Sequence, residues 1–332
     1  MNSRERIRTI MAGGTPDRCG FWLGNPHADT WPLLHAYFGT ATEEELRRKL
    51  GDDLRWIRPS RYAQPGREKL FEIPGKLAHG TRGPFADATT LADLEAYDWP
   101  RLDCLDWTDT VAALDKAGDV YRASGFWTSF YHNVMDLFGM EAYMMNMYLQ
   151  PELVLAVTDR VCQFYYDANE RFFAEAGDRV DAYFYGNDFG TQLDLICGPT
   201  QFDRFVLPWF RRFAAQGHRW GHQVVLHSCG SIHKVIERLI AAGVNGLHPL
   251  QALAAHMDAE TLARDFKGRI AFMGGIDTQE LLIHATPEAV WQEVRRVKAL
   301  LGPNLIVSPS HEAILPNVPP RNIAAMAEAA LE

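Results

Sequence analysis

The sequence predicts a (β/α)8 barrel, the TIM-barrel architecture, folded as one domain over residues 1–332. Short apolar runs rich in β-branched and aromatic residues recur along the chain, and each is followed by a longer stretch of helical periodicity. Eight such pairs fit a chain of 332 residues. A doubly wound open sheet is the alternative, but no Gly-x-Gly-x-x-Gly or phosphate-binding loop follows the first strand. The barrel is therefore the expected fold.

Each predicted strand is short and ends in a polar or turn residue. In chain order the strands are Cys19–Leu23, Leu54–Pro59, Val120–Gly125, Ala182–Gly186, Gln223–His227, Gly246–Leu247 with its flanks, Arg269–Met273 and Leu305–Pro309. The first residues, 1–8, predict an amphipathic helix. Later helices are expected to start at capping residues or at prolines, namely at Thr42, Pro151, Pro199, Ser231, Asp258 and Thr286.

Residues 60–98 predict an insertion after the second strand. Prolines and glycines punctuate this segment around two short runs, Leu70–Ile73 and Lys76–His79. Two runs separated by turn residues are typical of a β-hairpin, so the insertion is expected to contain one.

Composition limits the classes of function. The chain carries a formal charge of -9 and 47% hydrophobic residues, and no apolar run is long enough to span a bilayer. An acidic chain without a basic stripe is a poor ligand for nucleic acid. Five scattered cysteines indicate free thiols, and the charged first residues do not resemble a secretory signal. We therefore expect a cytoplasmic protein that acts on a small molecule and binds neither nucleic acid nor a membrane.

Polar and aromatic residues collect at or just past the ends of the predicted strands. In a barrel this is the face that carries the chemistry, so these residues are the candidate site. They are Trp22 near the end of the first strand, Asn25 and His27 after it, Trp127, Tyr131 and His132 after the third, Asn187, Asp188 and Gln192 after the fourth, His227 and Cys229 at the fifth, His248 and Gln251 at the sixth, Asp277 at the seventh, and His311 and Glu312 after the eighth.

The pair His227 and Cys229 is the strongest single signal. Residues two apart on a strand point to the same side, so an imidazole and a thiolate can face one cation. That ligand pair suits zinc. A lone His-x-Cys is a short pattern, and a buried cysteine is also a common small core residue, so both interpretations stay open on the pair alone.

The whole chain resembles the uroporphyrinogen decarboxylase superfamily. The segments that carry the resemblance occur in order with family-like spacing: Thr15-Pro16-Asp17-Arg18, Gly186-Asn187-Asp188-Phe189-Gly190-Thr191-Gln192, His227-Ser228-Cys229-Gly230, Gly274-Gly275-Ile276-Asp277 and Pro316-Asn317-Val318-Pro319-Pro320-Arg321-Asn322-Ile323. The resemblance implies a (β/α)8 barrel and, since family members form dimers, a homodimer.

The superfamily contains two chemistries, and the chain is closer to one of them. True decarboxylases have an arginine-rich segment after the first strand that binds the carboxylates of a porphyrinogen, whereas this chain has Trp22-Leu23-Gly24-Asn25-Pro26-His27-Ala28-Asp29 there. A substrate with many carboxylates needs such cations. The resemblance therefore favours the zinc-dependent methyltransferase branch, with a decarboxylase-like lyase or a non-catalytic barrel as alternatives.

In the methyltransferase branch the resemblance implies a zinc site. His227 and Cys229 would be two ligands, and His311 stands near the place of the third, which is a cysteine in that branch. Asp188 and Glu312 are candidates for a fourth ligand or for proton handling. His227, Asp188 and Glu312 are thus the expected catalytic residues.

A corrinoid is implied by the same resemblance. No Asp-x-His-x-x-Gly corrinoid-binding signature occurs in the chain, so a cobalamin would arrive on a separate partner protein. The implied reaction moves a methyl group between that corrinoid protein and a small ether, amine or thiol, as an O-demethylase does with an ether.

Overall fold

Eight parallel strands form one sheet in the computed structural model. The structure describes residues 1–67, 69–71, 73, 76, 78 and 80–332. The strand order in the sheet is β1-β10-β9-β8-β7-β6-β5-β2. The bounds are β1 Gly20–Phe21, β2 Leu54–Trp56, β5 Tyr121–Ser124, β6 Ala182–Gly186, β7 Gln223–His227, β8 Gly246–His248, β9 Ala271–Ile276 and β10 Leu305–Pro309. All eight predicted strands are confirmed.

The two edge strands meet through Asp53, the residue that precedes β2. Its backbone N–H donates to the Phe21 carbonyl at 2.9 Å. Its carboxylate accepts from the Phe21 N–H at 3.0 Å. The same buried carboxylate receives Arg6 at 2.7 Å and Arg18 at 2.8 Å. The sheet therefore closes into a barrel, as the sequence predicts.

Helix α1 (Ser3–Met11) covers the amino-terminal end of the barrel. Ile7, Ile10 and Met11 are buried in one apolar cluster with residues that face the barrel interior, such as Phe184 and Val225. This end is thereby filled, so the opposite end, where the carboxyl termini of the strands lie, is the one available for chemistry.

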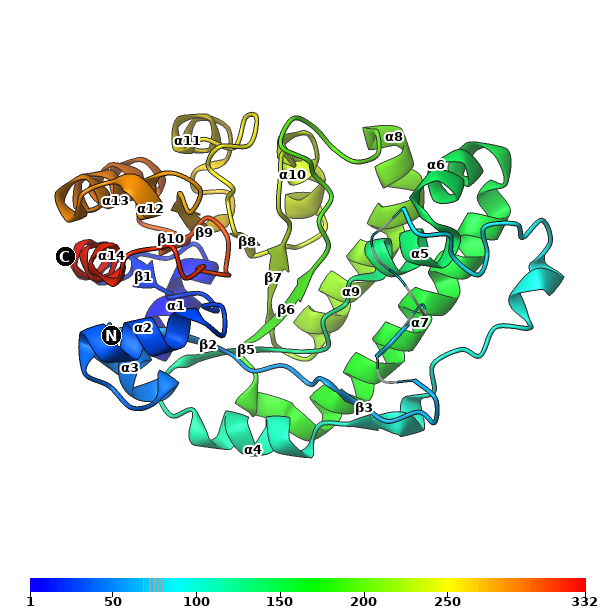
Figure 1. Cartoon of the computed structure of the whole chain (residues 1–332), viewed down its shortest axis with the longest axis horizontal. Helices are drawn as coiled ribbons and strands as arrows, with labels where there is room; N and C mark the ends of the chain where they lie inside the picture. Colours follow the sequence, from blue (N-terminus) through cyan, green and yellow to red (C-terminus); the bar gives the residue numbers. More distant parts are fainter. Residues whose placement is uncertain (68, 72, 74–75, 77, 79) are drawn as a thin grey trace.

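The other helices surround the sheet, as Figure 1 shows. They are α2 Thr30–Phe38, α3 Glu43–Lys49, α4 Thr108–Lys116, α5 Phe130–Phe138, α6 Met140–Leu149, α7 Pro151–Ala176, α8 Pro199–Gln201, α9 Leu207–Arg219, α10 His233–Ala241, α11 Ala259–Phe266, α12 Leu281–His284, α13 Pro287–Leu301 and α14 Pro320–Leu331.

Most of the predicted helix starts are confirmed, and one is displaced. Thr42, Asp258 and Thr286 accept hydrogen bonds from first-turn N–H groups as N-caps, and α7 and α8 begin at the predicted prolines. Helix α10 begins at His233, two residues after the expected Ser231. The Ser231 hydroxyl donates instead to the Ala255 carbonyl at 2.7 Å, so it joins two loops and does not cap the helix.

The expected insertion follows β2. A short antiparallel ladder of β3 (Arg61–Tyr62) with β4 (Leu105–Asp106) joins the start of this segment to residues beyond its expected end at 98. Between them, Phe71 packs edge to face on Phe164 of α7 with ring centroids 5.7 Å apart. The insertion therefore lies along this long helix. The two runs expected to form the hairpin strands lie partly outside the described residues: 70–73 and 76–79.

Replacing Asp53 by Asn is expected to destabilise the barrel. The variant leaves Arg6 and Arg18 without their shared buried carboxylate charge, a loss of roughly 3–5 kcal/mol in the free energy of unfolding. Urea denaturation measures the effect. The matched control is Asp103→Asn, because Asp103 also pairs with an arginine but its side chain is 91% exposed; it should cost less than about 1 kcal/mol. Equally small losses of stability in both variants would contradict the role of Asp53 in joining β1 to β2.

Because of the buried His222, we expect the free energy of unfolding to decrease as the pH drops below neutrality. The ring is buried against Phe173, and burial lowers the pKa of His222 from 6.5 to about 4. Below pH 6.5 the unfolded chain takes up a proton that the native protein does not accept until about pH 4. Stability is therefore lost as the pH falls through this interval, by on the order of 3 kcal/mol from this residue.

Urea denaturation at pH 7.5 and pH 5 tests the role of His222. His222→Phe is expected to lose less stability than the wild type between these two pH values. His284→Gln is the control, since the His284 side chain is 68% exposed. A His222→Phe variant whose stability falls as steeply as that of the wild type would refute this assignment.

Candidate active site

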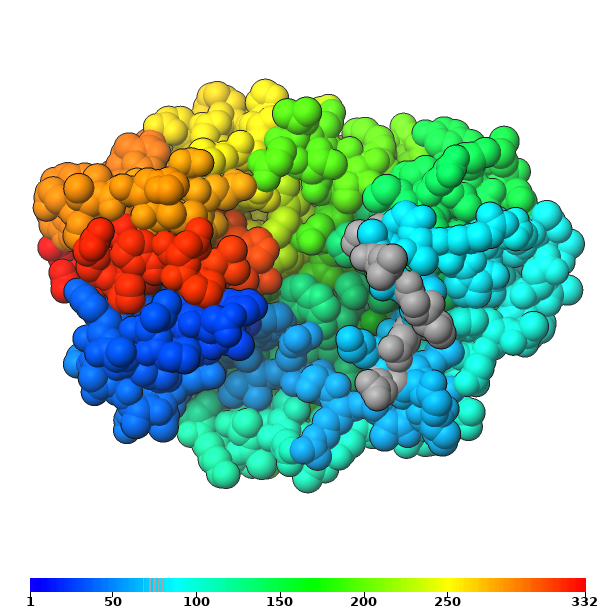
Figure 2. Space-filling model, in the orientation of Figure 1, coloured from blue at the N-terminus to red at the C-terminus, as the bar shows by residue number. Residues whose placement is uncertain are grey.

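The open end of the barrel is a hollow in the molecular surface. Figure 2 shows it near the centre of the view, bordered by N-terminal segments in blue, C-terminal segments in red and mid-chain segments in green. Segments far apart in the sequence therefore meet here. The loop after β1 is tied to the loop after β10, because the Asn25 N–H donates to the Glu312 carbonyl at 2.8 Å.

His227 lies at the centre of a partly buried polar cluster. Its side chain is 5% exposed, and its Nε2 lies 3.2 Å from Asp188 Oδ1 and 3.4 Å from Cys229 Sγ. Its Nδ1 lies 2.9 Å from His248 Nδ1 and 3.6 Å from Glu312 Oε2. Four loops and strand ends thus contribute to one imidazole.

Strand register explains why these side chains meet. In the parallel ladder His227 lies level with Gly186 on one side and with His248 on the other. Asp188, two residues beyond Gly186, therefore reaches the same height as the loop after β7, where its Oδ1 accepts the Cys229 N–H at 2.8 Å. The carboxylate fixes the backbone that carries the thiol.

The glycines of the two motifs allow the loops after β6 and β7 to touch. A Cβ on Gly230, whose φ is +80°, would lie 2.4 Å from the Gly190 carbonyl carbon. A Cβ on Gly190 would lie 2.6 Å from the Ser231 nitrogen. Only glycine permits this backbone contact, which keeps Asp188 beside Cys229.

Burial and neighbouring groups shift the pKa values of the side chains in the cluster. Burial opposes the charged form of His227, but hydrogen bonds with Asp188 and Cys229 raise its pKa well above the ordinary value. His248 is driven in the opposite direction, because burial and the neighbouring His227 charge lower its pKa. Burial alone would raise the pKa of Asp188, yet the contact with His227 lowers it. Two adjacent imidazoles thereby differ in protonation.

Two overlapping sets of side chains place potential metal ligands close together. In the described part of the chain, Asp188, His227 and Cys229 form one set and His227, His248 and Glu312 form the other, with ligand atoms within 4.8 Å in each. His311 is half-exposed. Its Nδ1 lies 3.7 Å from Glu312 Oε2, and its ring hydrogen-bonds Cys229, which raises the pKa of His311. The third expected ligand therefore lies beside the thiol.

An aromatic wall stands beside the cluster. Trp127 contacts His227 edge to face with ring centroids 5.3 Å apart, and Trp22 contacts His248 at 5.2 Å. Space for Trp127 depends on Gly186, since a Cβ there would lie 2.1 Å from the indole. The wall makes one side of the site apolar.

Some expected binding residues hold the frame of the site. Asn187 is buried and links the loop after β6 to the loop after β5. Its side chain accepts the Tyr131 N–H and donates to the Thr128 carbonyl, both at 2.8 Å. The Tyr131 ring is buried against Tyr143 and Phe189. Asn187 and Tyr131 therefore position the loops that reach the cluster.

Of the other expected binding residues, two contact members of the cluster or its loops and two lie elsewhere. The His132 charge acts on Asp188, and Gln251 Oε1 accepts the Gly230 N–H at 2.8 Å. His27 is half-exposed beside Asp29. Gln192 is exposed, and its described contact is a backbone bond from Ala255. His132 and Gln251 therefore border the site, whereas the described contacts of His27 and Gln192 are with residues outside the cluster.

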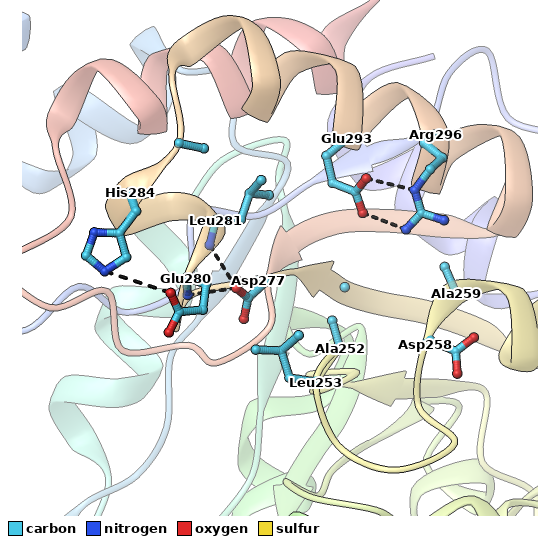
Figure 3. Close-up of a pocket in the computed structure, with 12 residues that line it drawn as sticks. Ala252, Leu253, Asp258, Ala259, Asp277, Glu280, Leu281, His284, Glu293 and Arg296 are labelled. Atoms are coloured by element: carbon cyan, nitrogen blue, oxygen red, sulfur yellow. Dashed lines mark hydrogen bonds and ion pairs between the residues drawn. The ribbon is translucent and has the colours of Figure 1, made fainter.

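Asp277 holds the turn that leads into helix α12 and lines a separate cavity. Its carboxylate accepts the N–H groups of Gln279, Glu280 and Leu281 at 3.1, 2.8 and 2.9 Å. Figure 3 shows these contacts among the residues that line the cavity, whose volume is about 520 Å³. The sequence pattern placed Asp277 at the end of a strand, but the turn that follows uses its carboxylate for the backbone.

Sequence reasoning missed the residues at the end of the second strand. Trp56 packs on Trp127 with ring centroids 5.0 Å apart, and the Arg58 guanidinium lies over the Trp56 ring at 4.9 Å from its centroid. The rule that pointed to the other strand ends also covers this one. Applied to Arg55-Trp56-Ile57-Arg58, it would have found both residues.

The barrel and its motifs define a family. The sequence model of the family described as uroporphyrinogen decarboxylase (URO-D) matches residues 78–332, more than half of the chain. The chain belongs to the uroporphyrinogen decarboxylase family, which confirms the resemblance of its motifs. Comparison with curated proteins gives no match.

A solved structure shares the fold over nearly its whole length. A methyltransferase from Methanosarcina mazei superposes on 99% of this chain and 98% of its own, with a TM-score of 0.68 and 16% sequence identity. This likeness extends the barrel assignment to residues before 78. No helix in the described ranges is both long and apolar enough to cross a membrane.

Proposed function

We propose that this protein is a methyltransferase that uses a zinc ion to move a methyl group between a small ether, amine or thiol and a separate corrinoid protein. The meeting of a thiol, a second imidazole and two carboxylates around His227, at the open end of a family barrel, carries the proposal. The likeness to a methyltransferase of the same fold supports this class of reaction.

The chemistry of the cluster fits a zinc ion. Thiolate, imidazole and carboxylate are the ligand types that zinc takes, usually with one position left open for a substrate. Glu312 Oε2 and His248 Nε2 are buried and lack a hydrogen-bond partner in the described part of the chain. Unpaired buried polar atoms of this kind are rare unless a ligand or ion completes them. We assign His227, Cys229 and His311 as the ligands, with Asp188 as a candidate for the fourth.

A bound zinc ion supplies a Lewis acid that polarises the heteroatom carrying or receiving the methyl group. The residues of the chain provide the surroundings. Trp22 and Trp127 cover one side of the cluster and exclude water from it. Asp188 orients the His227 ring and the Cys229 backbone together. This arrangement favours reaction at a fixed position.

Glu312 is placed to handle the proton that the reaction requires. Demethylation of an ether would hand the methyl group to the corrinoid of the partner protein and would leave the C–O electron pair on the oxygen, which would then take up a proton. Glu312 Oε2 lies 3.6 Å from His227 Nδ1 and 3.7 Å from His311 Nδ1. A carboxyl group at this position can give the proton in one direction and take it in the other.

Zinc content is the first measurement. The purified protein is expected to carry about one zinc ion per chain, as a three-ligand site requires. His227→Ala and Cys229→Ala should both lose it, because His227 belongs to both ligand sets and Cys229 supplies the soft ligand. His311→Ala should lose the zinc as well if His311 is the third ligand. Plasma mass spectrometry reports the metal.

The control for the zinc measurement is His284→Ala, at an exposed histidine of α12. It should bind zinc as the wild type does. Wild-type protein that stays metal-free after zinc is offered would overturn the zinc mechanism, and it would favour the lyase or the non-catalytic barrel.

Methyl transfer tests the reaction itself. Methylcobalamin incubated with the protein and a panel of thiols, phenols and amines is expected to lose its methyl group to one of them. The rate should fall roughly 100-fold or more in His227→Ala, the scale set by the loss of metal-binding groups. Absorbance of the corrinoid follows the reaction.

Two outcomes of the transfer assay would count against the proposal. One is a rate that is unchanged in His227→Ala. The other is release of carbon dioxide from a carboxylated substrate by metal-free protein, which would support the decarboxylase alternative.

A further inference from the structure

Arg58 is an arginine at the mouth of the barrel, just past the end of β2. The arginines that precede and follow it are paired, Arg55 with Glu44 and Arg61 with Asp109. In the part of the chain that the structure describes, the Arg58 guanidinium forms no salt bridge and no hydrogen bond, and its recorded contact is with the Trp56 ring. Five guanidinium N–H donors are therefore available there.

Arg58 lies close to the His227 cluster. Contacts lead from Arg58 to Trp56, from Trp56 to Trp127 and from Trp127 to His227. The Glu312 charge acts on Arg58, and Glu312 Oε2 is 3.6 Å from His227 Nδ1. One small molecule can thus meet both the guanidinium and the cluster.

The wall between these two ends suits a flat ring. Trp56 packs on Trp127 and on Phe184 with ring centroids 5.0 and 5.3 Å apart. The indole N–H groups of Trp22 and Trp56 are buried and unpartnered in the described residues. An aromatic ring would pack on the faces of Trp56 and Trp127, which are partly exposed, and an oxygen substituent on it would accept from the Trp56 N–H.

The charge balance of the mouth selects a monoanion. A guanidinium matches the two oxygens of a carboxylate in a planar fork. Asp188 and Glu312 belong to the same site, so a dianion such as a phosphate ester would be repelled more strongly than a carboxylate. Protein around Arg58 also lowers the pKa of its guanidinium by desolvation, and an anionic partner would offset that cost.

We propose that the substrate is an aryl carboxylate whose methyl group sits on a heteroatom of the ring, with its carboxylate bound by Arg58 and its ring packed against Trp56 and Trp127. The methyl group would then point to the His227 cluster. This inference rests on the proposed methyl transfer, and it narrows the substrate class to aromatic acids.

Two isosteric probes, 4-methoxybenzoate and its neutral amide 4-methoxybenzamide, test the inference. Isothermal titration calorimetry of the wild-type protein is expected to show that the acid binds about tenfold or more tightly than the amide, the usual scale of a charge-assisted contact. Arg58→Gln should bring this ratio close to one. Arg58→Lys, which keeps the charge but loses the planar fork, should give an intermediate ratio.

The matched control is Arg295→Gln. Arg295 lies over the Trp291 ring at 4.7 Å from its centroid, on helix α13 on the outside of the barrel. This variant removes the same kind of cation–π contact away from the mouth of the barrel, so the ratio of acid to amide affinity should stay at the wild-type value. Thermal unfolding of each variant confirms that its fold is intact.

Three results would overturn the inference: equal binding of acid and amide by the wild type, no binding of either, or a preference that survives in Arg58→Gln. Binding requires no corrinoid and no turnover, so the two proposals fail separately. A preference for the acid that depends on Arg58, without methyl transfer, would refute only the reaction. Transfer to or from neutral aryl ethers without any such preference would refute only the role of Arg58.

Discussion

Closure of the sheet at Asp53 is the constraint on which the site depends. Parallel strands already place all their carboxyl ends at one edge, but an open sheet would leave the loops after β1 and β10 far from those after β5 and β6. Because Asp53 joins β1 to β2, the row of strand ends becomes a ring. Loops from opposite ends of the chain then face one another across a few ångströms, and α1 closes the other end of the barrel.

The ring brings together charges that would be costly to bury one at a time. A single buried imidazolium or carboxylate is strongly disfavoured. Here His227 lies between Asp188 and Glu312, while burial keeps His248 neutral beside it. Each group limits the desolvation cost of the next. The cluster is thus a set of mutually dependent partners, and the backbone contact of Gly190 with Gly230 holds two of its loops in place.

The mouth of the barrel has two chemically different sides. On one side are the nitrogen, sulfur and oxygen ligands around His227, which suit a borderline-soft metal ion. On the other side are Trp56 and Trp127 with Arg58 at the rim, which suit a flat, singly charged organic molecule. A site of this kind holds the body of a substrate by apolar and ionic contacts and leaves its reacting atom beside the polar cluster.

The sequence by itself determined the strands, most helix starts and the His227 and Cys229 pair, because these follow from local rules of periodicity and capping. Local rules cannot tell which loops touch after closure. Only the tertiary structure bound the Asp277 carboxylate to the turn before α12, moved Ser231 from a cap to a loop contact, and placed Trp56 and Arg58 beside the site. The role of a polar side chain depends on the donors that the folded chain brings within about 3 Å of it, and these come from distant segments.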